Sequence, residues 1–336
     1  MLVKQDIATQ GLVKYALDNG GSIHPLIIDS NLTQGTGLMN PSVYVDDGKI
    51  LINVRHINYA LYHSEERKFP HQWGPLQYLH PEDDMTLRTE NYIMELYDDF
   101  TTKSVCKVEM TKNVDPVWHF IGLEDARLFK WNDKLYLCGV RRDHLDAQGK
   151  GRMDLSEIKF NGDTYVEVER TSLPAPSPNE SYCEKNWMPI LDRPNHWVKW
   201  SNPVEVVKYD FDLDQTITVH HNHVNYVPMP RDLRGGSQVL KWGDYHIAFT
   251  HEVSLYNDPL GRKDGTYLHR VVVWDKDWKI AKTTKDFTLM NGQIEFVTGM
   301  AFYQGNVLVS FGFQDNAAYL LVIPEKIFTN FMMRYV

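Results

Sequence analysis

The 336-residue sequence is poor in cysteine, and its only three cysteines, Cys106, Cys138 and Cys183, lie far apart without a CxxC spacing. Disulfide-stabilised secreted domains need paired cysteines, so we expect free thiols in a reducing, cytoplasmic compartment. No apolar run approaches the roughly 20 residues that a membrane-spanning helix needs. The first residues carry charges where a secretory signal would be apolar, so we expect no membrane association.

Positive charge is also scarce, because 35 Lys and Arg against 44 Asp and Glu give a formal net charge of −9. This balance disfavours a general nucleic-acid binder. The sequence has no HExxH, GxSxG, GxxxxGK[ST] or GxGxxG motif. Metalloprotease, serine hydrolase, P-loop and dinucleotide-binding functions therefore lack support. Aromatic residues are plentiful, with 9 Trp, 18 Tyr and 14 Phe, which excludes a mainly disordered chain.

The sequence does contain a degenerate repeat of β-hairpins. Five segments each run from a small or polar entry through a short strand and a tight turn to a strongly apolar strand: 40–55, 124–142, 186–202, 235–252 and 298–315. Their turns hold residues that favour chain reversal, namely Asp47-Gly48, Asn132-Asp133, Pro194-Asn195, Gly243-Asp244 and Gln304-Gly305. Further strand pairs follow several of them: 156–160 with 165–169, 204–209 with 216–220, and 269–274 with 279–284.

These repeats predict an all-β fold, specifically a five-bladed β-propeller that forms one domain over 1–336. The expected blades are approximately 38–110, 118–170, 182–220, 234–285 and 292–324. Units at a spacing of about 50–85 residues cannot bury both faces alone, so they must pack on one another. A generic β-sandwich or two smaller domains is the alternative.

Outside the repeat, we expect a short N-terminal helix within 6–20, a second short helix near 88–98, and long loops on one face. The tail 331–336 is expected to pack against the last blade.

Charged residues recur at the edges of the repeats, and ring closure would bring equivalent strand ends together at the axis. The candidate catalytic residues are Glu124, Asp125 and Asp315. The candidate substrate-binding residues are Arg55, Arg127, Arg141, Arg142, Glu184, Lys185, Asn186, Trp187, Arg234, His251 and Glu252. Strand alternation places Asp125 and Arg127 on one side and Glu124 on the other. An alternative is that Glu124-Asp125-x-Arg127 only caps a turn or ties adjacent blades together.

Three segments carry a resemblance to a known family. Gly122-Leu123-Glu124-Asp125-Ala126-Arg127 is similar to the Gly-x-Glu-Asp-Pro-Arg motif of glycoside hydrolase family 130, the mannoside phosphorylases and their relatives. Asn53-Val54-Arg55 resembles a first-blade strand ending in Tyr-Arg, and Gly312-Phe313-Gln314-Asp315 resembles a last-blade Gly-x-x-Asp. Two features depart from the pattern: Ala126 replaces proline, and Glu184-Lys185-Asn186-Trp187 is not a family hallmark. Tyr267-Leu268-His269-Arg270 is similar to a Tyr-x-His-Arg strand of propellers regarded as glycosyltransferases.

The resemblance implies an enzyme, either a glycosyltransferase or a glycoside phosphorylase, that uses a phosphorylated sugar donor and a hydroxyl acceptor. It implies that Asp125 acts as an acid or base, and that Arg55, Arg127 and Arg141 or Arg142 hold the phosphate. Arginine suits this task because its planar donors bind phosphate in a bidentate manner. Nucleic acid is a candidate partner only as the hydroxyl acceptor of the glycosyl group.

Two other functions remain open on the same fold. One is a hydrolase with Asp125 and either Glu252 or Asp315 flanking the bond; the other is a propeller that only binds glycans or a protein. Trp118, Trp187 and Trp200 are candidates for stacking on sugars, although core filling is the commoner role. His221 and His223 are a weak metal-ligand pair, and we expect no metal or cofactor.

Overall fold

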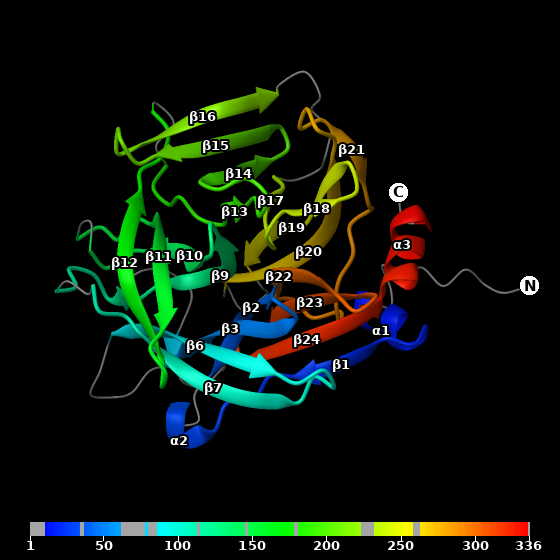
Figure 1. Cartoon of the computed structure of the whole chain (residues 1–336), viewed down its shortest axis with the longest axis horizontal. Helices are drawn as coiled ribbons and strands as arrows, with labels where there is room; N and C mark the ends of the chain where they lie inside the picture. Colours follow the sequence, from blue (N-terminus) through cyan, green and yellow to red (C-terminus); the bar gives the residue numbers. More distant parts are fainter. Residues whose placement is uncertain are drawn as a thin grey trace, which may run out of the picture.

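The protein is built almost entirely of β-strands, which confirms the predicted all-β class (Figure 1). The computed structural model describes residues 11–33, 37–61, 78–79, 86–112, 115–144, 147–177, 181–222, 232–257 and 263–334. Several long connections that the sequence places on one face, such as 62–77 and 223–231, lie outside these ranges.

Most strands belong to antiparallel units in which sequential strands pair. The first unit contains β2 (Leu38–Asp46), β3 (Lys49–Ile57), β6 (Leu87–Leu96) and β7 (Thr102–Glu109); the second contains β9 (Glu124–Trp131), β10 (Lys134–Arg141), β11 (Arg152–Phe160) and β12 (Tyr165–Leu173). The third contains β13 (Met188–Pro189), β14 (His196–Ser201), β15 (Val204–Asp210) and β16 (Gln215–Asn222). The fourth contains β17 (Arg234–Gly235), β18 (Leu240–Trp242), β19 (Tyr245–Asn257), β20 (Lys263–Trp274) and β21 (Ile280–Thr283).

The last unit is closed by the two ends of the described chain. β22 (Glu295–Tyr303), β23 (Asn306–Phe313) and β24 (Ala317–Pro324) pair in order, and the early strand β1 (Ser22–Pro25) adds to β24 in antiparallel register. Minor strands are β4 (Ala60–Leu61) with β5 (Tyr78–Leu79), and β8 (Phe120–Ile121) against β6. The first two units share one sheet through a short parallel pairing of β7 with β12.

The predicted hairpin turns are confirmed by backbone geometry. Asp47, Asn132, Asn195, Gly243 and Gln304 all have positive φ, as tight reversals between strands require. The second strand pairs of the second, third and fourth units are also confirmed.

One helix prediction is wrong, because 88–98 belongs largely to β6 rather than to a helix. Its first residues alternate in burial, with Leu87 and Thr89 buried and Arg88 exposed, which is a strand period. Pairing with β3 and β7 on its two edges outweighs the helix propensity of Leu, Met and Glu.

The inner strands of different units meet at the centre of the molecule. In Figure 1, β2, β9, β17 and β22 lie near the middle, and β7, β12, β16 and β21 lie at the rim. The side chain of Gln238, which is fully buried, joins these units. Its Nε2 donates to the carbonyl oxygens of Val43 (3.0 Å) and Leu128 (2.6 Å), and its Oε1 accepts from the Met300 amide (3.1 Å).

We expect Gln238→Leu to lower the free energy of unfolding by about 3 kcal/mol or more. The substitution leaves two carbonyl groups and one amide group buried without a partner, and each costs about 1–3 kcal/mol. Urea unfolding of the variant measures the loss. Gln215→Leu, at an exposed position of the rim strand β16, is the matched control and should stay within about 0.5 kcal/mol of wild type. Equal stability of the two variants would contradict the central role of Gln238.

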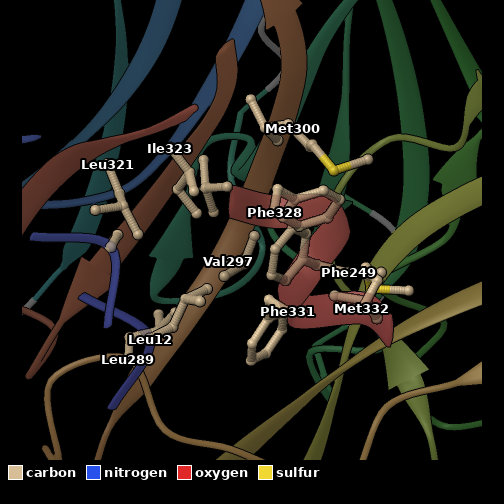
Figure 2. Packing of buried hydrophobic residues seen from close by; sticks show 14 of the residues in the cluster. Leu12, Phe249, Leu289, Val297, Met300, Leu321, Ile323, Phe328, Phe331 and Met332 are labelled. Carbon is tan, nitrogen blue, oxygen red and sulfur yellow. The ribbon is translucent and has the colours of Figure 1, made fainter. Parts of the chain in front are cut away.

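Helices cover the junction between the fourth and the last unit. α3 (Glu325–Arg334) follows β24, and Figure 2 shows its Phe328, Phe331 and Met332 packed with Phe249 of β19 and Val297 of β22. The expected packing of the tail is therefore confirmed for Phe331 and Met332, although the segment is helical.

The predicted N-terminal helix is α1 (Gly11–Leu17), with its 6–10 portion outside the described residues; α2 (Ser30–Thr33) is a single turn. In the described part of the chain, no helix combines the length and apolar character needed to cross a membrane.

Candidate active site

The first two residues of β9, Glu124 and Asp125, both face Arg55 on β3 of the neighbouring unit. Arg55 Nη1 donates to Asp125 Oδ1 at 2.7 Å, and Arg55 Nη2 lies 3.6 Å from Glu124 Oε2. Arg55 is only 4% exposed, so water screens these ion pairs weakly. Arg55 Nε also donates to Thr89 Oγ1 (3.1 Å) and Nη2 to Tyr59 Oη (2.7 Å). All three guanidinium nitrogens are therefore engaged and hold the arginine in one orientation.

The predicted alternation of Glu124 and Asp125 does not hold, because both carboxylates reach the same arginine. Asp125 has φ 50°, and the pairing of β9 with β10 shifts register between Cys138 and Val140. A left-handed residue at such an irregularity breaks the period of two and redirects the side chain.

Four polar residues of the site share this left-handed backbone. Asn40, Asp125, Asn186 and Asp315 have φ values of 43°, 50°, 62° and 49°, and they come from four different units. Asn and Asp tolerate this conformation better than other residues with a Cβ, but it still costs free energy. Asn40 Nδ2 donates to Asp125 Oδ1 at 2.7 Å, so two of the four are in direct contact. Such strained residues concentrate where a side chain must be aimed at a site.

Two glycines of the family-like motifs are explained by close packing around these residues. A Cβ on Gly312 would lie 2.2 Å from Asn40 Oδ1, and a Cβ on Gly122 would lie 2.2 Å from the Thr89 carbonyl oxygen. Both distances are far inside van der Waals contact. Only glycine at these two positions therefore leaves room for Asn40, the partner of Asp125, and for Thr89, the partner of Arg55.

The two aspartates have opposite electrostatic environments. Burial alone would raise the pKa of Asp125, but Arg55, the Asn40 amide and Arg127 outweigh it and lower this pKa to about 2. Desolvation is the largest influence on Asp315, and the negative charges of Asp125 and Glu124 add to it. These effects outweigh the attraction of Arg55 and Lys185 and raise the pKa of Asp315 to about 6. Near neutral pH the site therefore holds one permanently ionised carboxylate and one that can gain or lose a proton.

Arg127 is fully buried and connects Asp125 to two other units. Its Nη1 donates to the Asp125 carbonyl oxygen (2.8 Å) and to Asn186 Oδ1 (3.3 Å), and its Nε donates to the Gly236 carbonyl oxygen (2.9 Å). Its guanidinium carbon also lies 5.4 Å from the ring centroid of Phe296. Arg127 therefore fixes the backbone of the site, and any ligand contact by it stays a prediction.

Three cations act electrostatically on the imidazole of His251. Burial is the main cause that lowers the pKa of His251 well below its usual value, and His269, Arg234, Arg127 and Lys185 lower it further. His251 is thus neutral at physiological pH. Lys185 is exposed and Arg234 is half-buried, so these two cations, unlike Arg55 and Arg127, are open to solvent.

The Tyr-x-His-Arg strand lies behind this histidine. The ring of Tyr267 stacks on His251 at a centroid distance of 5.6 Å and an angle of 7°. Arg270 forms an ion pair with Glu252, which is 1% exposed. A role for Glu252 in binding substrate therefore stays a prediction, because in this structure it serves a buried ion pair.

Two further arginines predicted from the sequence, Arg141 and Arg142, contact different groups of carboxylates. Arg141 is 2% exposed, and its Nη1 and Nε lie 3.2 Å from Asp143 and 3.4 Å from Asp154, respectively. Arg142 Nε lies 3.6 Å from Glu124 Oε1, which joins it to the carboxylate cluster. The structure thus brings Arg142 to Glu124 and places Arg141 in a separate buried ionic cluster.

The predicted tryptophans differ sharply in exposure. Trp187 has no exposed surface, and its Nε1 donates to Glu184 Oε2 at 3.1 Å. Trp118 is 8% exposed, whereas Trp200 is 39% exposed. Trp200 is therefore the member of the three with a broad ring face open to a ligand.

A hollow of about 650 Å³ opens beside the exposed cations. Its lining includes Glu184, Lys185, Asn186, Trp187, Trp200 and Arg234, all of which were predicted from the sequence as candidates for binding substrate. Arg55, Asp125 and Asp315 do not line it. The hollow thus adjoins the carboxylate cluster through Lys185 and Asn186.

Some members of the site were missed by sequence reasoning. Asn40 is the first residue of the first repeat segment, as Asn186 is of the third. This equivalent position was the feature of the sequence from which Asn40 could have been predicted. Thr89 and Tyr59 gave none, because single polar residues are common in strands. His223 lies outside the described residues, and within them no group of three His, Cys, Asp or Glu side chains is arranged to hold a metal ion.

No family model matches the sequence, and neither does any curated protein. Solved structures do resemble it. A β-1,2-mannobiose phosphorylase from Listeria innocua is 12% identical with a TM-score of 0.56, over 93% of this chain and 96% of that one. A mannose phosphorylase from Leishmania mexicana in complex with phosphate, MPT-4, is 13% identical with a TM-score of 0.50, over 94% and 93%.

A third structure comes from the GH130 family of mannoside phosphorylases, which contains hydrolases that target β-1,2-mannosidic linkages in Candida mannan. It is 11% identical with a TM-score of 0.58, over 87% and 85% of the two chains. The predicted resemblance to glycoside hydrolase family 130 is therefore confirmed at the level of the fold.

Proposed function

We propose that the protein is a five-bladed β-propeller enzyme, one domain over 1–336, that transfers a glycosyl group between a phosphorylated donor and a hydroxyl acceptor. The observation that carries this proposal is the pair of neighbouring aspartates with pKa values of about 2 and about 6, next to solvent-open cations. The mannoside phosphorylases of similar fold support sugar chemistry with phosphate. Nothing in the site favours a nucleic-acid acceptor.

The two aspartates take different roles in this reaction. In the synthetic direction the bond from the anomeric carbon to the phosphate oxygen breaks, and the phosphate leaves with the electron pair. Ionised Asp125 stabilises the positive charge that develops on the sugar. The acceptor oxygen attacks the anomeric carbon, and its proton passes to Asp315. In phosphorolysis Asp315 returns that proton to the departing oxygen, as microscopic reversibility requires.

This assignment moves the proton from Asp125, where the family resemblance puts it, to Asp315. A group with a pKa of about 2 stays ionised at neutral pH and is a poor proton carrier, whereas one with a pKa of about 6 is well matched. Arg55 and Glu124 then act as positioning residues, because both contact the Asp125 cluster inside the protein.

Phosphate recognition falls to Lys185 and Arg234. The sequence suggested Arg55 and Arg127, but all three nitrogens of Arg55 are engaged by Asp125, Thr89 and Tyr59. Nε and Nη1 of Arg127 bind backbone carbonyls and Asn186, and its Nη2, which has no hydrogen-bond partner among the described residues, is buried. Lys185 and Arg234 are open to solvent, and both act on neutral His251. A phosphate between them makes charge-assisted hydrogen bonds without breaking an existing ion pair of Asp125.

We expect Lys185→Ala and Arg234→Ala each to raise the KM for inorganic phosphate about tenfold or more, because each removes a charge-assisted hydrogen bond. The assay is phosphate-dependent release of sugar 1-phosphate from mannobiose. Lys150→Ala, a half-buried lysine outside the hollow, is the control and should leave this KM unchanged. Equal rates of sugar release in phosphate-free buffer would assign a hydrolase instead. An absence of turnover with every donor tested would favour a binding-only protein.

A further inference from the structure

The hollow beside Lys185 and Arg234 is not where the reacting sugar lies. Both cations line it, and both act on His251, so it is continuous with the cationic side of the site. Asp125 and Asp315 are absent from its walls. The donor sugar and the acceptor hydroxyl must both reach these carboxylates. A group that fills the hollow is therefore separated from the reacting atoms by the phosphate-binding cations.

The volume of the hollow indicates that its occupant is larger than inorganic phosphate. Its volume of about 650 Å³ is typical of a site for a drug-sized ligand, and inorganic phosphate would leave most of it empty. The occupant lies beyond the phosphate and away from the sugar. It is therefore a substituent carried by the phosphate itself.

The walls of the hollow indicate the chemistry of that substituent. Trp200 lines the hollow and is 39% exposed as a residue. Glu205 and Asp232 supply carboxylate oxygens, which accept hydrogen bonds from hydroxyl and amino groups. Glu205 is 4% exposed, and Lys199 Nζ lies 3.7 Å from it and 3.7 Å from Glu184, so one buried cation serves two buried carboxylates.

We propose that the hollow binds the nucleoside of a nucleotide-sugar donor, with the base on Trp200 and the ribose hydroxyls toward Glu205 and Asp232. This inference rests on the proposed function, and it selects a nucleoside diphosphate as the leaving group. The excess of carboxylates on the inner wall suits the hydroxyl and amino donors of a nucleoside, and the cations Lys185 and Arg234 suit the phosphates.

Titration calorimetry with ADP, GDP, CDP, UDP and inorganic phosphate tests this inference on the full chain. At least one nucleotide should bind about tenfold or more tightly than phosphate. Trp200→Ala should weaken that nucleotide at least about fivefold, the loss expected when a base loses its stacking partner, and should leave phosphate affinity unchanged. Lys185→Ala should weaken both ligands.

Phe211→Ala is the matched control, because Phe211 is also an exposed aromatic residue (51%). It follows the last residue of β15, whereas Glu205 lies near the first residue of that strand. It should change neither affinity. Nucleotides that bind no more tightly than phosphate, or that bind equally well to Trp200→Ala, would overturn the inference. Transfer from a sugar 1-phosphate could still be found in that case, and the proposed function would stand. Nucleotide binding through Trp200 without sugar transfer to any acceptor would remove the proposed function and keep the nucleoside site.

Discussion

Asp125→Asn should lose about 10³-fold in turnover and about 2 kcal/mol in the free energy of unfolding at pH 7. Turnover falls because the variant lacks the charge that stabilises the developing oxocarbenium ion. Stability falls because the pKa of Asp125 is lowered from 3.8 to about 2 in the folded protein, and each unit is worth about 1.4 kcal/mol. A lowered pKa gives stability that is present above pH 3.8 and is lost as the pH falls toward 2.

Single-turnover kinetics and urea unfolding measure the two effects separately. Asp163→Asn, in the exposed turn between β11 and β12, is the control and should change neither. The double variant Asp125→Asn/Arg55→Met should regain stability relative to Asp125→Asn, since it no longer buries a cation that has lost its 2.7 Å carboxylate partner and keeps only Glu124 at 3.6 Å, but it should regain no turnover. Turnover of Asp125→Asn within tenfold of wild type would remove Asp125 from the chemistry.

The strand pattern was predictable because it depends on local chemistry. Residues such as Asp47 and Asn132 mark tight turns by their tolerance of positive φ, and the apolar runs after them form buried strands. The pairing of β1 with β24 was not predictable, because it joins segments about 300 residues apart and SIHP carries no strand signal of its own. The same limit applied to β6, whose strand form depends on its two neighbours.

The sequence indicated which residues lie together in the candidate site better than it indicated what each of them contacts. Polar residues at equivalent phases of the repeats, namely Arg55, Asp125, Asn186 and Asp315, were predicted to lie together because equivalent strand ends of packed units converge. Which atoms face a ligand depends on register shifts and left-handed residues that the sequence does not reveal. Arg127 illustrates this limit: its charge suggested phosphate binding, yet its Nε and Nη1 donate to backbone carbonyls inside the protein.

The two directions of the reaction should respond to pH in opposite ways. Synthesis needs Asp315 ionised to accept a proton, so its kcat/KM should rise about tenfold per pH unit up to about pH 6 and then level. Phosphorolysis needs Asp315 protonated, so its kcat/KM should fall about tenfold per unit above pH 6. Phosphate groups also ionise near this pH, and comparison with Asp315→Asn separates the two sources because the substrate is the same.

Asp315→Asn should be roughly 100-fold slower in both directions and should keep only the pH dependence of the substrate. The variant also tests the cause of the raised pKa. Desolvation makes ionised Asp315 unfavourable in the folded protein, so wild-type stability falls as the pH rises from 3.8 to about 6. Asp315→Asn should remove that fall in a series of unfolding curves. A pH profile of Asp315→Asn identical in shape to that of wild type would remove Asp315 from the proton transfer.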